Sequence, residues 1–131
     1  MIGRVGDLMP IRIETDAPFL RILMEGHITG ADLLDAVNDL ERLERGLPRV
    51  PDRIVDMSAI ELETNFGNVM ELAARRNAQV FPNPFRSAVV APTPKLLGFS
   101  RMFQTLNTNP QIELRIFDTR DSAEAWLMGQ S

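Results

Sequence analysis

The sequence contains no cysteine and no tyrosine, and only one histidine and one tryptophan among its 131 residues. The lack of cysteine excludes thiol catalysis, disulfide bonds and cysteine-based zinc or iron–sulfur sites. No apolar run approaches the roughly 20 residues that a membrane-spanning helix needs. The first residues also lack the long hydrophobic region of a signal peptide. These absences predict a cytoplasmic protein without a transmembrane segment.

The composition is that of an ordinary globular domain. Hydrophobic residues make up 44% of the chain and charged residues 24%, which is enough apolar material for a core. We therefore expect a single domain that spans residues 1–131. The net charge is −4, and no dense basic stripe with interleaved aromatic residues is present, so nucleic acid is not expected as a partner.

Five strands are predicted. Residues 10–15 alternate apolar and polar side chains, residues 19–25 are mostly apolar, and the intervening Asp16-Ala17-Pro18 indicates a turn. Two strands joined this closely form an antiparallel hairpin. Three further strands are predicted from short apolar runs at 53–57, 86–91 and 112–117.

The first predicted helix has the clearest boundaries. Thr29 is the expected N-cap, Asp32 completes a reciprocal cap, and Ile28 with Leu33 forms a hydrophobic staple. Gly46 is expected to end the helix in a left-handed conformation. An apolar stripe faces the core and consists of Leu33, Leu34, Val37, Leu40 and Leu43.

Three more helices follow. The second has a predicted core face of Phe66, Val69, Met70, Ala73 and Asn77. The third begins at the N-cap Thr93, and its predicted inner side is formed by Leu96, Phe99, Met102, Phe103 and Leu106. The last is capped by Asp118 or Thr119 and buries Ala123, Trp126 and Leu127.

The resulting order, β-β-α-β-α-β-α-β-α, predicts an α/β fold. Its sheet is mainly parallel after the opening antiparallel hairpin, and helices pack on it.

That order resembles the STAS fold of the SpoIIAA-type anti-anti-sigma factors. Family members show a buried strand, then a pattern like Asp-Leu-Ser-Gly, four further residues, and Asp-Ser-Ser-Gly before a helix. Here Asp-Met-Ser-Ala at 56–59 and Thr-Asn-Phe-Gly at 64–67 stand at the same spacing. The serine that the family phosphorylates falls on Asn65, which cannot be phosphorylated.

The resemblance implies a non-enzymatic protein-interaction or regulatory module without the usual serine switch. Its implied partner is a protein, such as a regulatory kinase or an anti-sigma-like protein, or a second copy of the chain in a homodimer. The implied partner-binding residues are Ser58, Thr64, Asn65, Phe66 and Gly67.

The 29–46 helix and the C-terminal strand and helix with Ala-Trp-Leu look more like the SpoIIAA-like branch, which is compared with lipid-binding Sec14-type domains. This comparison leaves a second function open, a carrier or sensor of a small apolar or lipid-like ligand. The third helix is apolar on more than one side, which fits either burial or an exposed patch for a ligand or a dimer. The candidate ligand-binding residues are Thr93, Lys95, Phe99, Met102 and Phe103.

No catalytic residue is predicted. Asp56 ends a strand, where ligands of α/β proteins collect, but His27 is the only histidine, and no Ser-His-Asp, HExxH or GxGxxG pattern is present. We therefore expect neither an enzyme, nor a metal site, nor a cofactor. The basic residues Arg75, Arg76, Arg86 and Arg101 are expected on solvated faces, or around an acidic partner or phosphate group.

Overall fold

The computed structural model describes residues 10–15 and 18–129. Their five strands form one sheet. The strands lie in the order in which they occur in the chain. β1 pairs antiparallel with β2, and all other neighbours pair in parallel, which confirms the predicted α/β fold. Asp16 and Ala17 of the predicted turn lie outside the described residues. The strands are β1 (Ile11–Glu14), β2 (Leu20–Thr29), β3 (Arg53–Glu63), β4 (Phe85–Val90) and β5 (Ile112–Phe117).

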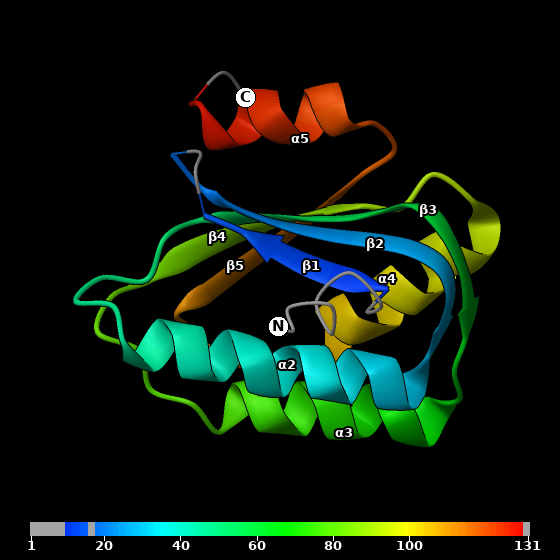
Figure 1. The fold of residues 1–131 in the computed structure, drawn as a ribbon, viewed down its shortest axis with the longest axis horizontal. Helices are drawn as coiled ribbons and strands as arrows, with labels where there is room; N and C mark the ends of the chain where they lie inside the picture. The colour runs from blue at the N-terminus through cyan, green and yellow to red at the C-terminus, as the bar shows by residue number, and fades with distance from the viewer. Residues whose placement is uncertain (1–9, 16–17, 130–131) are drawn as a thin grey trace, which may run out of the picture.

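Four helices within the described ranges pack on the sheet. α2 (Gly30–Arg45), α3 (Phe66–Asn77) and α4 (Pro94–Leu106) lie on one face and α5 (Arg120–Leu127) on the other (Figure 1). Each face has its own core. The side chains of β3 alternate between them, because successive residues of a strand point to opposite faces. Met57 packs in the core under α2, α3 and α4, whereas Ile54 packs with Trp126 under α5.

The predicted helix N-caps are confirmed. Thr29 and Asp32 form the expected capping box, with Asp32 N–H donating to Thr29 Oγ1 at 3.2 Å and Thr29 N–H donating to Asp32 Oδ2 at 2.9 Å. Thr93 caps α4 ahead of Pro94, and Thr119 rather than Asp118 caps α5. Each cap satisfies backbone donors that the first turn of a helix leaves without partners.

The strand β3 is longer than predicted. It continues past residue 57 to Glu63, and residues 59–63 pair with residues 25–29 of β2. The pairing with β4 stops at Asp56, so the ends of β2 and β3 extend beyond the rest of the sheet as a two-stranded ribbon. The segment between the predicted strand at 53–57 and α3 is therefore mostly strand. Its alternation of Ile60 and Leu62 with Glu61 and Glu63 agrees with a half-buried strand.

Two predictions about helix faces are correct only in part. The buried face of α3 is Val69, Leu72, Ala73 and Arg76, while Phe66 and Met70 are 56% and 47% exposed. In α4 the buried residues are Leu96 and Ser100, and Met102 is exposed. In both helices the true core stripe includes a polar residue, which hydrophobic periodicity passes over.

The end of α2 also differs from the prediction. Gly46 has a φ of −85°, in the right-handed region, rather than a left-handed conformation. Its N–H and that of Leu47 donate to the carbonyls of Leu43 and Glu44, and this tighter last turn satisfies helix carbonyls without a left-handed residue.

Candidate functional site

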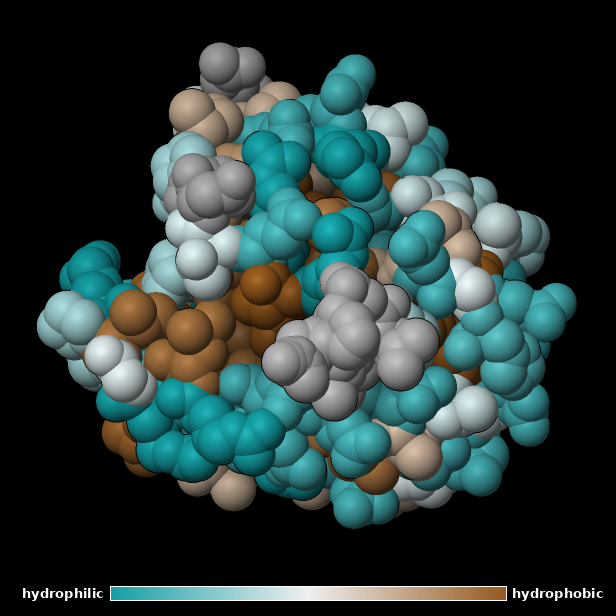
Figure 2. All heavy atoms as spheres, in the orientation of Figure 1, coloured by the Kyte–Doolittle hydropathy of each residue, from teal (hydrophilic) through white to brown (hydrophobic). Residues whose placement is uncertain are grey.

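A cavity of about 130 Å³ lies between the sheet and the helices α2, α3 and α4. Its wall is almost entirely apolar and comes from all five strands and all three helices on that face. Figure 2 shows apolar side chains gathered at the surface between the sheet and the C-terminal part of α2. The apolar residues that line the cavity include Ile13, Ile22, Met24, Val37, Leu40, Met57, Leu72, Phe99, Phe103 and Leu114.

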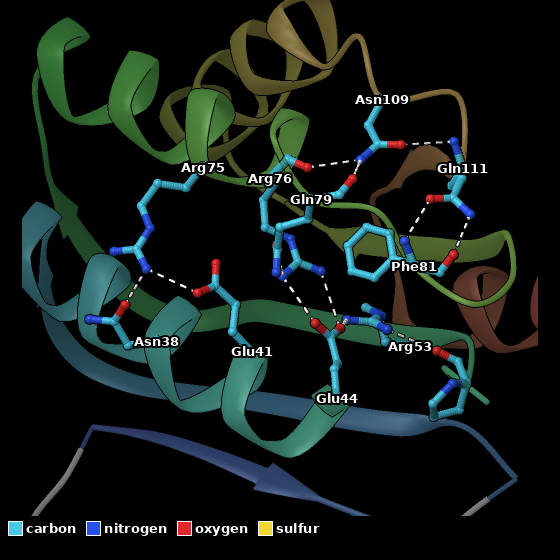
Figure 3. A network of polar contacts seen from close by, with 11 residues as sticks. Asn38, Glu41, Glu44, Arg53, Arg75, Arg76, Gln79, Phe81, Asn109 and Gln111 are labelled. Carbon is cyan, nitrogen blue, oxygen red and sulfur yellow. Dashed lines mark hydrogen bonds and ion pairs between the residues drawn. The ribbon is translucent and has the colours of Figure 1, made fainter. Parts of the chain in front are cut away.

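A buried group of charges adjoins this cavity. Arg53 and Arg76 both line it, and both donate to Glu44 (Figure 3). Arg53 Nη1 lies 2.6 Å from Glu44 Oε2, and Arg76 reaches the two carboxylate oxygens at 3.1 and 3.2 Å. All three side chains are buried. The fold thus places two guanidinium groups and one carboxylate beside an apolar space.

Neighbouring groups hold the two arginines in place. The Arg53 guanidinium lies 4.0 Å from the centre of the Phe85 ring, and its Nη2 donates to the carbonyl of Pro51. Arg76 lies over Phe81 at 5.1 Å and donates to Gln79. Stacking on an aromatic face favours a cation and suits the planar guanidinium in particular.

Burial lowers the pKa of Arg53 to about 10, although the nearby Glu44 carboxylate acts in the opposite direction. Arg53 remains a cation at neutral pH, because a pKa near 10 is still well above 7. The cavity therefore has a permanently positive group in its wall.

The predicted ligand-binding residues separate into two sets. Phe99 and Phe103 line the cavity. Met102 is exposed on another side of α4, Thr93 caps that helix, and Lys95 is exposed in its first turn. Hydrophobic pattern therefore located the cavity-facing side of α4, but the polar residues proposed with it lie elsewhere.

The predicted partner-binding residues lie at the start of α3. Asn65 is the N-cap and forms a capping box with Asn68: Asn68 N–H donates to Asn65 Oδ1 at 2.9 Å. Thr64 also donates its hydroxyl to Asn68, while Phe66 and Gly67 are exposed. Ser58 lies within β3 rather than in this turn.

Asp56 and Ser58 belong to a polar group on the α5 side of the sheet. The pairing of β2 with β3 shifts by one residue here, and Asp56 Oδ1 accepts from the N–H and the hydroxyl of Ser58 at 2.9 and 2.6 Å. Arg120 donates to Oδ2 of Asp56. Burial raises the pKa of Asp56, but the hydrogen bonds from Ser58 and Arg120 outweigh it, so this pKa lies below its ordinary value. A low pKa does not suit a general base at neutral pH.

The single histidine lies on the exposed ribbon. His27 Nδ1 and Nε2 contact the carboxylates of Glu61 and Glu63 at 3.4 and 2.9 Å. Hydrogen bonds that the ring donates to the carboxylates of Glu61 and Glu63 raise the pKa of His27. Across residues 10–15 and 18–129, no group of three or more acidic or histidine side chains is arranged to hold a metal ion. Over the same part of the chain, no helix is long and apolar enough to cross a membrane.

Comparison with known proteins identifies the fold. No family model matches the sequence, and no curated protein shows significant similarity to it. Among solved structures, the chain is similar to an uncharacterised protein of the DUF3478 family with a SpoIIAA-like fold, from Shewanella loihica PV-4. The similarity covers 89% of this chain and 91% of that one, with 18% sequence identity and a TM-score of 0.57. The chain has a SpoIIAA-like fold.

The SpoIIAA-like fold confirms the architecture expected from the order of elements. At 18% identity the similarity concerns the fold, so the function of the chain has to be argued from its own residues. Sequence reasoning missed the residues that distinguish the cavity, Glu44, Arg53, Arg76 and Ser100. The signal that could have located Glu44 and Arg76 is a charged residue at a core position of each helix, α2 and α3.

Proposed function

We propose that the protein is a non-enzymatic, SpoIIAA-like binding module that holds a small apolar ligand between its sheet and the helices α2, α3 and α4. The observation that supports this is the cavity of about 130 Å³ with its apolar wall. A dry apolar cavity of about this size can take up a benzene-sized molecule, and protein interiors otherwise leave few voids larger than a water molecule. A non-enzymatic role is supported by the engagement of Asp56 with Ser58 and Arg120.

A pair of matched variants tests this function. Ala36 lines the cavity, and Ala36→Leu should fill part of it, whereas Ala74 is exposed on α3 and Ala74→Leu should leave it open. Both substitutions keep a strong helix former. With toluene as the probe, the wild type and Ala74→Leu should show a raised Tm, because a ligand that binds only the folded state stabilises it. Ala36→Leu should show a smaller shift or none.

Equal shifts of Tm with toluene in Ala36→Leu and Ala74→Leu would contradict this function. No change of Tm with toluene in the wild type, together with a native mass equal to that of the bare chain in freshly purified protein, would remove the support for a ligand-binding role.

A second candidate function is protein interaction at the start of α3, as the resemblance to STAS domains implies. The supporting observation is the exposure of Phe66 and Met70, which lie one helical turn apart beside the N-cap Asn65. Exposed large apolar residues that adjoin one another are typical of interaction sites. This surface and the cavity belong to different parts of the molecule, so the two functions are compatible.

The interaction surface is tested by recovering bound proteins from cell extract with wild-type protein and with Phe66→Lys. Val80→Lys is the control, because Val80 is 91% exposed and lies beyond the end of α3. Loss of specific partners with Phe66→Lys alone is expected. Recovery of the same proteins by all three forms would contradict this role.

A further inference from the structure

Four polar side chains interrupt the apolar wall of the cavity, and they come from four different elements. Arg53 lies on β3, Ser87 on β4, Arg76 on α3 and Ser100 on α4. Arg53 and Ser87 are register partners on neighbouring strands, so they lie side by side in the sheet. Arg53 and Arg76 meet at Glu44. The cavity therefore has a polar part formed around the two arginines and a larger apolar part.

Two of these polar side chains have buried atoms without a hydrogen-bond partner. Ser100 is only 2% exposed, and its Oγ has no partner among the described residues. Arg53 is equally buried, and its Nε has none either. Nearly all buried polar groups in native proteins are hydrogen-bonded, and a buried donor without a partner is costly. Unused donors in the wall of a cavity are what a bound acceptor would satisfy.

The charge of the group also points to an acceptor that is an anion. Glu44 is one carboxylate against two guanidinium groups, which leaves one positive charge in excess. The nearby Asp52 carboxylate is already paired with Arg86. Buried charges need a partner, and guanidinium groups match a carboxylate especially well because they offer paired donors in one plane.

The size of the cavity limits the ligand. A cavity of about 130 Å³ is close to the roughly 150 Å³ that accommodates a benzene-sized molecule. A hydrated multivalent anion such as inorganic phosphate does not fit a wall that is apolar except at its polar part. A monoanion with a compact apolar body fits both parts at once.

We propose that the ligand of this cavity is a small monocarboxylate, whose apolar body lies against the aliphatic and phenylalanine side chains and whose carboxylate binds at Arg53, Arg76 and Ser100. This inference rests on the proposed function of the cavity and adds the chemical class of its ligand. The excess positive charge is then neutralised, and the unused donors gain an acceptor.

The test compares three probes of similar shape that differ in their polar group: benzoate, benzamide and toluene. Affinities and binding positions are measured by titrating ¹⁵N-labelled protein at pH 7 and following backbone amide signals by NMR. We expect benzoate to bind at least about tenfold more tightly than benzamide. A charge-assisted hydrogen bond is roughly twice as strong as a neutral one, and a difference of about 1.4 kcal/mol is tenfold in affinity. The largest signal changes should include Arg53, Arg76 and Ser100.

The Ser100→Ala variant checks the role of the hydroxyl group. It should weaken benzoate binding severalfold and affect toluene binding much less, because toluene accepts no hydrogen bond from the hydroxyl group. Its stability without ligand should equal or exceed that of the wild type, since the substitution removes a buried polar atom that has no partner. Thr105→Ala is the control, because Thr105 lies exposed on the same helix outside the cavity wall.

The outcomes separate the two proposals. Binding of toluene without a preference for benzoate would overturn the carboxylate inference and leave the ligand-binding function in place. No binding of any probe would overturn both, and the polar part would then be satisfied by water alone. Benzoate binding that Ser100→Ala and Thr105→Ala weaken equally would also contradict the assignment of the carboxylate to this position.

Discussion

The side chain of Asn65, which the resemblance to STAS regulators aligns with their phosphorylated serine, caps α3. The carboxamide oxygen accepts the Asn68 N–H, and the Asn68 side chain accepts the Asn65 N–H. Asn65, which replaces the phosphorylated serine of the family pattern, therefore has a structural role as a helix cap. The spacing of residues 56–67 predicted the position of Asn65, and the structure adds its role as an N-cap.

Replacing Asn65 tests this role. Asn65→Ala should lower the free energy of unfolding by about 1 kcal/mol, because an N-cap acceptor is lost. Asn65→Ser should stay close to the wild type, because serine is an equally good N-cap. Chemical denaturation of the three proteins measures the difference. Equal destabilisation by alanine and serine would show that capping is not what Asn65 contributes.

The carboxylate of Asp56 should make stability depend on pH. Hydrogen bonds from Ser58 and Arg120 hold its pKa below the ordinary value in spite of burial. A group with a lowered pKa stabilises the fold above its unfolded-state pKa of about 3.9 and loses that contribution as the pH falls through its folded pKa. Asp56→Asn should therefore cost about 1–3 kcal/mol at pH 7, and its difference from the wild type should shrink below about pH 4.

Denaturation of both proteins at a series of pH values measures this effect, with Asp118→Asn as a control because Asp118 is exposed. If the free energies of unfolding of Asp56→Asn and the wild type differ by a constant amount down to pH 2, the lowered pKa of Asp56 is contradicted.

His27 offers a direct measurement, because it is the only histidine in the chain. Its contacts with Glu61 and Glu63 raise its pKa above 6.5. The stabilisation of the fold by these contacts is therefore complete below pH 6.5 and is lost as the pH rises through the raised pKa. An NMR titration of the imidazole signals should give a pKa above 6.5, and Glu63→Gln should lower it. A wild-type pKa at or below 6.5 would contradict the contact geometry.

At the scale of elements, the sequence predicted where most strands and helices begin but not how far β3 extends. Caps are local, so Thr29, Thr93 and the last helix were predictable from neighbouring residues. The alternation at residues 59–63 is typical of a half-buried strand, although the predicted strand ended at residue 57. The prediction for the buried face of α3 missed Arg76, because Arg76 is buried through its ion pair with Glu44, which is 32 residues away in the chain.

Helix α5 depends on Arg86 for its attachment at the C-terminal end. Arg86 donates to the carbonyls of Trp126 and Leu127 at 2.8 and 2.6 Å and pairs with Asp52 at 3.0 Å. A cation suits the last carbonyls of a helix, which carry partial negative charge. Arg86 was expected on a solvated face, and the structure instead places it between β4 and α5.

We expect Arg86→Ala to loosen α5 while the rest of the sheet stays intact. Hydrogen exchange should accelerate at residues 120–127, and the fluorescence of Trp126, the only tryptophan, should shift towards that of an exposed indole. Arg101→Ala serves as the control, because Arg101 is exposed on α4. Unchanged exchange in α5 would contradict an anchoring role for Arg86.

At the scale of the whole molecule, the sequence did not predict the cavity. Its apolar lining follows from hydrophobic patterns on each element, and Phe99 and Phe103 were among the predicted ligand-binding residues. The empty volume itself depends on how three helices and a sheet fit together, which no local pattern specifies. The group of Glu44, Arg53 and Arg76 likewise unites three elements that are distant in the chain.

Removing the charge of Glu44 should strongly destabilise the protein. Glu44→Gln leaves two buried guanidinium groups without their carboxylate, and breaking a buried ion pair from one side costs about 3–5 kcal/mol. Glu41→Gln is the matched control on the same helix, where the pair with the partly exposed Arg75 contributes about 1 kcal/mol or less. Chemical denaturation measures both variants. If Glu44→Gln and Glu41→Gln lower the free energy of unfolding equally, burial does not determine how much the Glu44 ion pairs stabilise the fold.

The central claim is that the apolar space between the sheet and the helices α2, α3 and α4 binds a ligand. Intermolecular nuclear Overhauser effects between the protons of bound toluene and the methyl groups of the protein test it most directly. The structure predicts such contacts with Leu40, Met57 and Leu72, which line the cavity. Contacts confined to the exposed Met70 and its surroundings, or none at all, would contradict the claim.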